Sequence, residues 1–345
     1  MIWLTLRQFR VQAAAVFGGL AVLGVFLAAT GPGLADDYGR GLASCTAQHN
    51  CDQFGSRFFS EHWGNYGVLV AIIIALPGLI GVFWGAPLIT RELETGTHRL
   101  VWNQSITRTR WLAVKLGLVG LSAMVAAGIA VLALSWWADP LDKAGVSEQP
   151  RITPLLFGAH GVVPIGYAGL AFVLGVTAGV LTRRTLPAMA ITLAVFAAVQ
   201  VVTPLWIRPH LVPPKSATVT ITQQNLSQMT LDNGADVMEV QTSAAPGAWT
   251  IENRTVDASG HEAALPPSLM NGACAPAPPE AGHEPPPGPP EKCFTEIARL
   301  GFKQKVVYQP ADRFWLLQWA ETGLFAVLAL GLSGLCFYWT RRRLS

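Results

Sequence analysis

The sequence predicts an α-helical integral membrane protein with six transmembrane helices, both termini in the cytoplasm, and a small β-rich extracellular domain between the fifth and sixth helices. Two observations lead to this fold class: six long stretches carry almost no charge, and basic residues gather at every second end of them. A helix needs roughly 20 apolar residues to cross the hydrocarbon core, and it satisfies its own backbone groups where water is absent. The six windows are Val11–Ala35, His62–Thr90, Leu116–Ala138, Ile152–Thr182, Thr185–Ile207 and Thr322–Thr340.

The composition agrees with lipid as the solvent for most of the chain. Of the 345 residues, 51% are hydrophobic and only 13% are charged, whereas a soluble domain carries about 25% charged residues. The charges that do occur are concentrated between the apolar windows. This distribution argues against a chain made of ordinary soluble domains.

The placement of basic residues gives the predicted orientation. Cytoplasmic loops are enriched in Lys and Arg, and with Met1 inside, twelve basic residues fall on the cytoplasmic side against four in the two short outer loops. A nucleic-acid partner is not expected, because the arginines at 341–343 are typical of the end of a last span. The twelve are Arg7, Arg10, Arg91, Arg99, Arg108, Arg110, Lys115, Arg183, Arg184, Arg341, Arg342 and Arg343, and the four are Arg40, Arg57, Lys143 and Arg151.

The N-terminal residues allow two interpretations. Apolar residues at helical spacing in Met1–Gln12 indicate a short amphipathic helix in the membrane interface, or else simply the cytoplasmic end of the first span. Arg7 and Arg10 before an apolar run also imitate a secretory signal. Because this run is long for a signal and fits the count of basic residues, we expect it to be retained.

The remaining spans carry local signals of their own. The stretch Pro32–Glu61 reads as a polar external loop, and Pro77 is expected to kink the second span. Small residues four apart, at Gly81 and Gly85 and again at Gly175 and Gly179, are typical of close helix contacts in membranes. Only Arg183 and Arg184 separate the fourth and fifth windows, and Pro187 follows closely, so we expect these spans to form an antiparallel hairpin.

The segment 208–313 is the one sizeable hydrophilic unit, and it divides the chain into 1–207, 208–313 and 314–345. We expect a small β-rich domain with a proline-rich connector at 266–290. Strand-like patterns occur at Ala217–Thr222, Asp236–Val240, Trp249–Val256 and Lys305–Tyr308.

Five cysteines fall into two classes. Cys45 and Cys51 lie in the first outer loop and Cys274 and Cys293 in the large outer segment, whereas Cys336 lies inside the last span. An even number outside indicates disulfides in an oxidising space, and pairing Cys45 with Cys51 and Cys274 with Cys293 closes two local loops. Four free thiols are the alternative, and a metal site is not expected.

No catalytic motif is recognisable. A phosphate-binding loop of the G-x-x-x-x-G-K type is absent from the sequence, so this chain is not expected to bind ATP or any other cofactor by itself. His261-Glu262 lacks the second histidine of a zinc protease, and Ser333 lacks the spacing of a nucleophile elbow. A membrane-anchored enzyme is therefore not favoured.

The most informative stretch lies between the second and third windows. It reads as a helix end carrying Glu92 and Glu94, a break at Gly96, a short helix, and a restart capped by Ser105 or Thr107. A charged helix suspended between two spans is well placed to receive force from a soluble partner. An ordinary solvated loop is the alternative.

This stretch resembles the permeases of the type-2 family of ATP-binding-cassette exporters, in the form common in actinobacteria. The motif Glu92-Leu93-Glu94-Thr95-Gly96-Thr97, followed by Ser105–Arg110 and Lys115, carries the resemblance, and Thr182–Pro187 and Tyr308-Gln309-Pro310 add to it. The six-span plan is also similar. The large outer segment departs from the family pattern, in which short re-entrant helices often join the last two spans.

The resemblance implies a half-transporter that pairs with a second permease copy, as a homodimer, and docks two separate ATPase subunits, which hold ATP and Mg. The interval Thr95–Thr107 would contain a coupling helix, and the turn at 183–184 would be a second ATPase contact. The implied location is a bacterial cell membrane. The residues assigned to ATPase coupling, within segment 90–110 and the turn, are Arg91, Glu92, Glu94, Thr95, Gly96, Thr97, Arg99, Ser105, Arg108, Arg183 and Arg184.

Three polar residues within spans are candidates for a translocation path. Intramembrane carboxylates usually face a cavity or a partner, so Glu321 is the first candidate, with His160 and Gln200 after it. The alternatives are an interfacial position for Glu321 and helix–helix hydrogen bonds for the other two. The function expected is export of an amphiphilic or hydrophobic compound; the rival is a non-transporting regulatory complex that senses through the extracellular domain.

Overall fold

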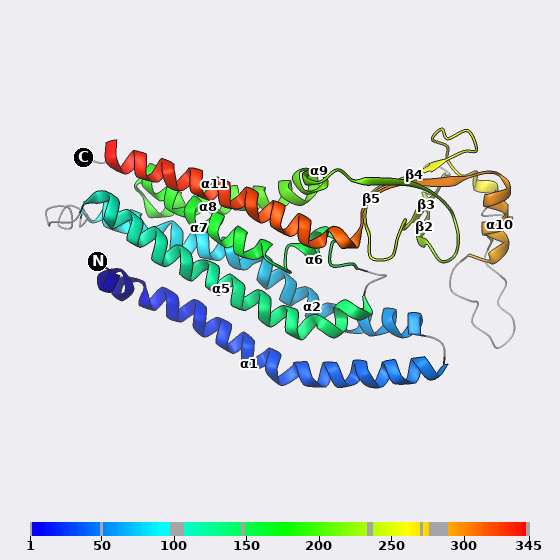
Figure 1. Ribbon diagram of the computed structural model, residues 1–345, viewed down its shortest axis with the longest axis horizontal. Coiled ribbons are helices and arrows are strands. Elements are labelled where there is room, and N and C mark those ends of the chain that lie inside the picture. Colours follow the sequence, from blue (N-terminus) through cyan, green and yellow to red (C-terminus); the bar gives the residue numbers. More distant parts are fainter. Residues whose placement is uncertain are drawn as a thin grey trace. The chain divides into compact units, whose positions relative to one another are not determined.

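The computed structural model describes residues 2–48, 51–96, 107–145, 149–232, 237–269, 272–275 and 289–342 (Figure 1). The chain forms two compact units. The first, here called the membrane unit, comprises Met1–Leu211 and Phe314–Ser345, and the second, the sheet unit, comprises Val212–Arg313. The predicted boundary at residue 208 falls early, because a helical turn, α9 (Arg208–Leu211), still continues the fifth span.

Six helical stretches in the described residues are long and apolar enough to cross a membrane, which confirms the predicted number of spans. Four of them are single helices: α1 (Ile2–Gln48), α5 (Arg108–Ala144), α7 (Val163–Thr182) and α11 (Phe314–Arg342). The second span consists of α2 (Cys51–Ile80), the π-helical turn η1 (Gly81–Gly85) and α3 (Pro87–Glu94). The fifth consists of α8 (Thr185–Val202), the π-helical turn η2 (Thr203–Ile207) and α9.

The predicted polar loop at Pro32–Glu61 is wrong, because both spans continue as helices toward each other. Helix α1 is 47 residues long and passes through Pro32, and α2 begins at Cys51. Aromatic side chains provide the reason: the ring of Tyr38 lies 6.0 Å from that of Phe54 and 5.5 Å from that of Phe58. These contacts give the helical extensions an apolar seam, so the two helices pack instead of unwinding.

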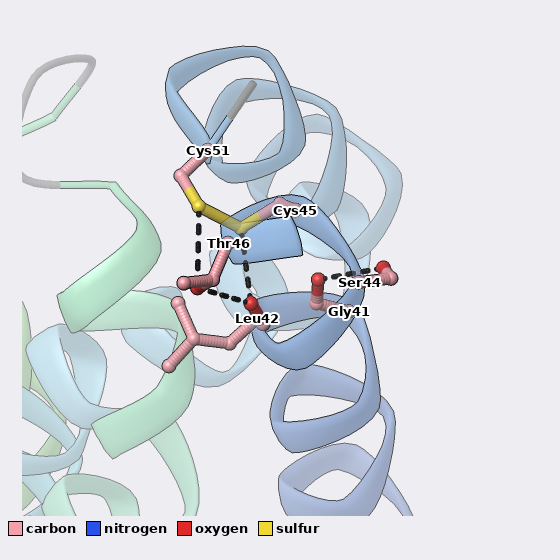
Figure 2. Close-up of a disulfide and its surroundings, with 6 residues drawn as sticks. All are labelled: Gly41, Leu42, Ser44, Cys45, Thr46 and Cys51. Carbon is pink, nitrogen blue, oxygen red and sulfur yellow. Dashed lines mark hydrogen bonds between the residues drawn. A yellow bond between two sulfur atoms is a disulfide. The ribbon is translucent and has the colours of Figure 1, made fainter. Parts of the chain in front are cut away.

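The Cys45–Cys51 disulfide joins the two helix ends at the tip of this hairpin (Figure 2). On the α1 side, the Thr46 hydroxyl donates a hydrogen bond to the Leu42 carbonyl at 2.7 Å. Of the two expected pairings, this one lies in the membrane unit and Cys274–Cys293 lies in the sheet unit. Cys336 is buried as a free thiol, 3.2 Å from the hydroxyl of Thr177.

The N-terminal residues form the end of the first helix and not a separate interfacial helix. Helix α1 runs without a break from Ile2 into the first span. Phe9 is buried against Trp84 with ring centroids 4.6 Å apart, and the Gln12 amide donates to the Phe83 carbonyl at 3.1 Å. The beginning of α1 is therefore fixed against η1, one turn before α3.

Helix α7 is the most buried of the six spans, and Gly175 on it lies against Gly81 and Gly85 of η1. A Cβ atom added to Gly175 would lie 2.3 Å from the Gly81 carbonyl oxygen, and one added to Gly85 would lie 2.4 Å from the Phe172 oxygen. The predicted close contact at small residues is therefore present: Gly175 packs against Gly81 and Gly85, and Gly179 packs against Ala86 and Thr90. Close backbone approach of this kind is available only without side chains.

A short helix, α6 (Pro154–Phe157), precedes α7, so the fourth window is interrupted at its beginning. Its end and the residues up to Val162 form turns before α7 begins at Val163. The amide of Gln318 on α11 fills this corner: its Oε1 accepts from the backbone N–H groups of Val162 and Val163, both at 2.9 Å, and its Nε2 donates to the Phe157 carbonyl at 3.1 Å. One side chain thus satisfies three backbone groups that the break would leave unpaired.

The sheet unit contains two antiparallel sheets. One has the strand order β1–β5–β4, with β1 (Lys215–Thr220), β5 (Lys303–Gln309) and β4 (Trp249–Val256), and the other pairs β2 (Leu226–Asp232) with β3 (Val237–Thr242). Val306 is completely buried at the centre of the three-stranded sheet, between Ala217 and Asn253. Of the five strands, β2 is not expected from the sequence.

The core of the sheet unit forms around the second disulfide. Helix α10 (Glu291–Arg299), also not expected, buries Cys293, Phe294 and Ile297 on one face. They pack with Cys274, Leu265 and Val240, among others, in a small apolar cluster. Most of the predicted proline-rich connector, from 276 to 288, lies outside the described residues; its beginning includes a single 3-10 turn at Pro267–Leu269. The bridge thus ties a short helix to a core with few large side chains.

The glycine contact predicts a mutational asymmetry. Gly175→Ala places a methyl group where the Gly81 carbonyl lies, so η1 and α7 must separate, at a cost of about 1–3 kcal/mol. Gly24→Ala on α1 is the matched control, since a Cβ there meets no atom within 4 Å. Thermal unfolding of the purified protein in detergent, followed by size-exclusion chromatography, should show a lower midpoint for Gly175→Ala only. Equal midpoints for the two variants would refute the contact.

Candidate functional site

The segment implicated by the sequence motif begins on α3 and breaks where the motif predicts. Gly96 adopts a positive φ of 71°, and the N–H groups of Thr95 and Gly96 donate to the carbonyls of Arg91 and Leu93, which ends the helix. The residues at 97–106 lie outside the described part of the chain, and with them Thr97, Arg99 and Ser105. The chain is described again from Thr107, whose hydroxyl accepts from the N–H of Arg110 at 3.3 Å and so caps α5.

Glu92 connects α3 to α5. Its carboxylate lies 2.6 Å from the ammonium of Lys115, whose side chain is only 4% exposed. The same ammonium donates to the Leu88 carbonyl at 3.3 Å and lies 4.9 Å from the centre of the Trp111 ring. The lysine is thus almost enclosed by α3 and by its own helix, and Glu92 provides the charge that compensates it.

Glu94 connects α3 to the beginning of α8. Its Oε1 accepts from the backbone N–H of Thr185 at 2.7 Å, and its Oε2 accepts from the Thr185 hydroxyl at 2.8 Å. A carboxylate at this position satisfies a free N–H of the first helical turn and complements the positive end of the helix dipole. Thr90 adds to the contact, with its hydroxyl 3.0 Å from that of Thr185.

The tight turn before Thr185 is the predicted hairpin between the fourth and fifth spans. Arg183 ends α7 with a φ of 55°, in the left-handed region, and Arg184 is extended and precedes α8. Both arginines are exposed, as is Arg91 on α3, whereas Arg108 at the beginning of α5 is half-buried. Glu94 therefore places the α3 end beside a turn that presents basic side chains.

The partners of the two acids cannot be read from the motif. The resemblance places Glu92 and Glu94 at an ATPase contact or in a polar belt above it, and the structure gives each an intramolecular partner on a different span. Lys115 is recognisable as part of the motif, but nothing in the spacing pairs it with Glu92. Thr185 is recognisable only as the beginning of a span.

Glu321 lies within a buried ion pair on the opposite half of the membrane unit. The guanidinium of Arg208 on α9 donates to both oxygens of Glu321 on α11, from Nε at 2.7 Å and from Nη2 at 3.0 Å. Neither side chain is more than 1% exposed. Nη1 of the arginine donates to the Pro154 carbonyl, and its guanidinium carbon lies 4.2 Å from the centre of the Phe157 ring.

This pair corrects the interpretation of two residues. The sequence places Arg208 in the hydrophilic segment and allows Glu321 a position at the membrane interface. Two features of the sequence could have indicated the pair. A carboxylate inside a span needs a partner, and Arg208 directly follows the fifth apolar window.

His160 belongs to a second buried polar network, centred on Asp142 of α5. The Tyr66 hydroxyl on α2 donates to Asp142 Oδ1 at 2.6 Å, while Arg151 Nε and His160 Nε2 lie 2.9 and 3.3 Å from Oδ2. His160 Nδ1 lies 2.9 Å from the Leu156 carbonyl. Asp142 does not stand out in the sequence, because it follows the end of the third apolar window and reads as a loop residue.

Gln200, the third candidate for a path, connects α8 to α2 by donating from Nε2 to the Ile74 carbonyl at 2.9 Å. All three candidates therefore join helices. For Gln200 and His160, hydrogen bonds between helices are the alternative role given in the sequence analysis.

The stability of the protein is expected to depend strongly on both partners of the Arg208–Glu321 ion pair. Glu321→Gln leaves a buried guanidinium without a countercharge, which costs roughly 3–5 kcal/mol. The double variant Arg208→Met/Glu321→Gln removes both charges and should recover much of that loss, whereas Arg40→Gln, which breaks the exposed pair with Asp37, should have little effect. Thermal midpoints in detergent would measure this, and a double variant no more stable than Glu321→Gln would contradict it.

Comparison with known proteins identifies the family. A family model described as "ABC-2 membrane transporter related" matches residues 17–208, more than half of the chain. Searches of curated proteins and of solved structures gave no match. The match covers nearly all of the first five spans, including Glu92, Glu94 and the turn at 183–184, and it ends before the sheet unit. The chain therefore belongs to the ABC-2 membrane transporter related family, as a multi-pass membrane protein of the ABC-2 permease type.

Proposed function

We propose that this chain is the permease subunit of an ATP-driven exporter, coupled to two separate ATPase subunits and paired with a second permease copy as a homodimer. The family match supports a permease, and the family implies ATPase partners. ATP and Mg are held by those partners and not by this chain. The observation that carries the proposal is that Glu92 and Glu94 fix the α3 end of the predicted coupling segment to two further spans.

The proposed orientation places both termini and the interval Thr95–Thr107 in the cytoplasm of a bacterial cell, with the sheet unit outside. The bias of basic residues toward that side supports it. The order of spans also supports it: the Cys45–Cys51 bond lies between the first and second spans and the Cys274–Cys293 bond between the fifth and sixth. An even number of crossings puts both bonds on one side, which in this orientation is the oxidising one.

In the proposed mechanism, ATP hydrolysis moves the coupling helix, and α3 transmits this motion. Because the Glu92–Lys115 pair holds α5 and the Glu94–Thr185 contact holds the beginning of α8, a displacement of α3 moves three spans together. Helix α8 leaves most of its surface uncovered by its own chain, so it is available to line a path between two permeases. The proposed cargo is an amphiphilic or hydrophobic compound. Glu321, Gln200 and His160 keep the helices beside that path in place.

Charge reversal at Glu94 tests the coupling. Glu94→Lys places an ammonium against the N-terminus of α8 and beside Arg184, which should release α3 from α8 while the spans remain inserted. The expected result is a folded permease that recruits less ATPase on copurification or exports at a strongly reduced rate in membrane vesicles. Glu61→Lys, at an exposed acid near the opposite end of the α2–α3 span, is the matched control. Export and recruitment equal to the control would exclude the proposed role of Glu94.

One observation favours a second candidate, a non-transporting complex that signals through the sheet unit. The chain enters the sheet unit from α9 and leaves it into α11, and the Arg208–Glu321 pair holds these two helices together. A change of the sheet unit could therefore act on two spans at once. The two functions are distinguished in proteoliposomes that contain the permease and its ATPase. If a candidate compound stimulates ATP hydrolysis and also moves across the membrane, export is supported. If it stimulates ATP hydrolysis without net movement, signalling is supported.

A further inference from the structure

A long apolar groove lies along the membrane unit, between α5 and α11 and over α7. Its volume is about 520 Å³. Gly117 and Gly120 lie on the α5 wall, Gly169 and Phe172 on the α7 floor, and Ala329 and Phe337 on the α11 wall. A Cβ atom added to Gly117 would meet nothing within 4 Å, so the groove is open there.

The groove has the length of one acyl chain in one leaflet. Along α5 it extends from Ala113 to Met124, and along α11 from Thr322 to Phe337. At 1.5 Å per residue, these stretches are roughly 17 and 22 Å long. Half of the hydrocarbon core is about 15 Å thick, so a groove of this length is long enough for one acyl chain that crosses one leaflet.

Two arginines lie one helical turn beyond the groove, one on each wall helix. Figure 1 shows that α5 begins and α11 ends at the same end of the membrane unit. Arg110 precedes Ala113 by three residues and Arg341 follows Phe337 by four, so each arginine lies on the same helix face as a lining residue, one turn further out. Both are exposed, and in the part of the chain that the structure describes, neither side chain pairs with an acid.

We propose that this groove binds an anionic phospholipid, with one acyl chain along α7 and the phosphate against Arg110 and Arg341. Apolar walls match the acyl chain, and the two exposed arginines beyond the groove match an anionic headgroup. A second copy of the permease fits less well, because in the same orientation it brings further arginine-bearing helix ends to this side. The proposal concerns a resident lipid and does not depend on what the protein transports.

Native mass spectrometry of the full-length permease, purified in detergent and stripped of lipid, tests the site with two probes, phosphatidylglycerol and phosphatidylcholine. We expect one tightly bound phosphatidylglycerol per chain and weaker binding of phosphatidylcholine. Gly117→Leu fills the groove and should abolish tight binding, and Ser333→Leu fills it from the α11 wall should the first variant not fold. Gly334→Leu is the control, since it adds the same side chain on α11 where no atom lies within 4 Å and outside the lining.

The headgroup contact has its own test. Arg110→Gln and Arg341→Gln should each weaken the binding of phosphatidylglycerol about fivefold, since one basic residue near the surface contributes about that factor to the affinity. The binding of phosphatidylcholine should not change. Arg342→Gln is the matched control: it removes a charge at the same helix end, but this guanidinium lies over the Tyr338 ring. Equal binding by Gly117→Leu and Gly334→Leu, or equal losses for Arg341→Gln and Arg342→Gln, would overturn the proposal.

Discussion

The close approach of η1 to α7 is the contact on which the arrangement of the membrane unit depends. Gly81 and Gly85 lie against α7 around Gly175 so closely that a Cβ atom on any of the three would overlap a backbone oxygen. Because α3 begins directly after η1, this contact also determines where Glu92 and Glu94 lie. From that position one acid reaches Lys115 on α5 and the other reaches the first turn of α8. A packing contact between glycines thereby decides which polar contacts form about two turns later.

The number of spans could be predicted from the sequence, because each long apolar window between charged segments satisfies its backbone in lipid as a helix. The positions of the helix ends could not. The stretch after Pro32 is polar, and hydropathy alone cannot tell a loop from a helix that continues into water. The seam of Tyr38, Phe54 and Phe58 depends on two segments packing together, which is a tertiary effect. In the sheet unit, β2 lacks strict alternation, and α10 has only nine residues, so neither carries a periodic signal.

The same distinction applies to the site. The motif around Glu92, Glu94 and Gly96 could be recognised from residue types and spacing, and the predicted break at Gly96 is present. The partners of the acids could not be recognised, because Thr185 lies about 90 residues from Glu94 and Arg208 lies about 110 residues from Glu321. Glu321 shows how far chemistry alone can lead: a buried carboxylate requires a countercharge, but only the fold selects Arg208 for it.

The α1–α2 hairpin has a mechanical consequence. At 1.5 Å per residue, α1 is roughly 70 Å long, more than twice the thickness of about 30 Å of the hydrocarbon core, so a straight crossing of the core uses less than half of the helix. When the first span tilts by a few degrees in the bilayer, the far end of so long a helix is displaced by several ångströms. Because a covalent bond joins Cys45 to Cys51 there, the ends of α1 and α2 must move together. A small rearrangement of the first two spans therefore produces a larger displacement at the tip of the hairpin.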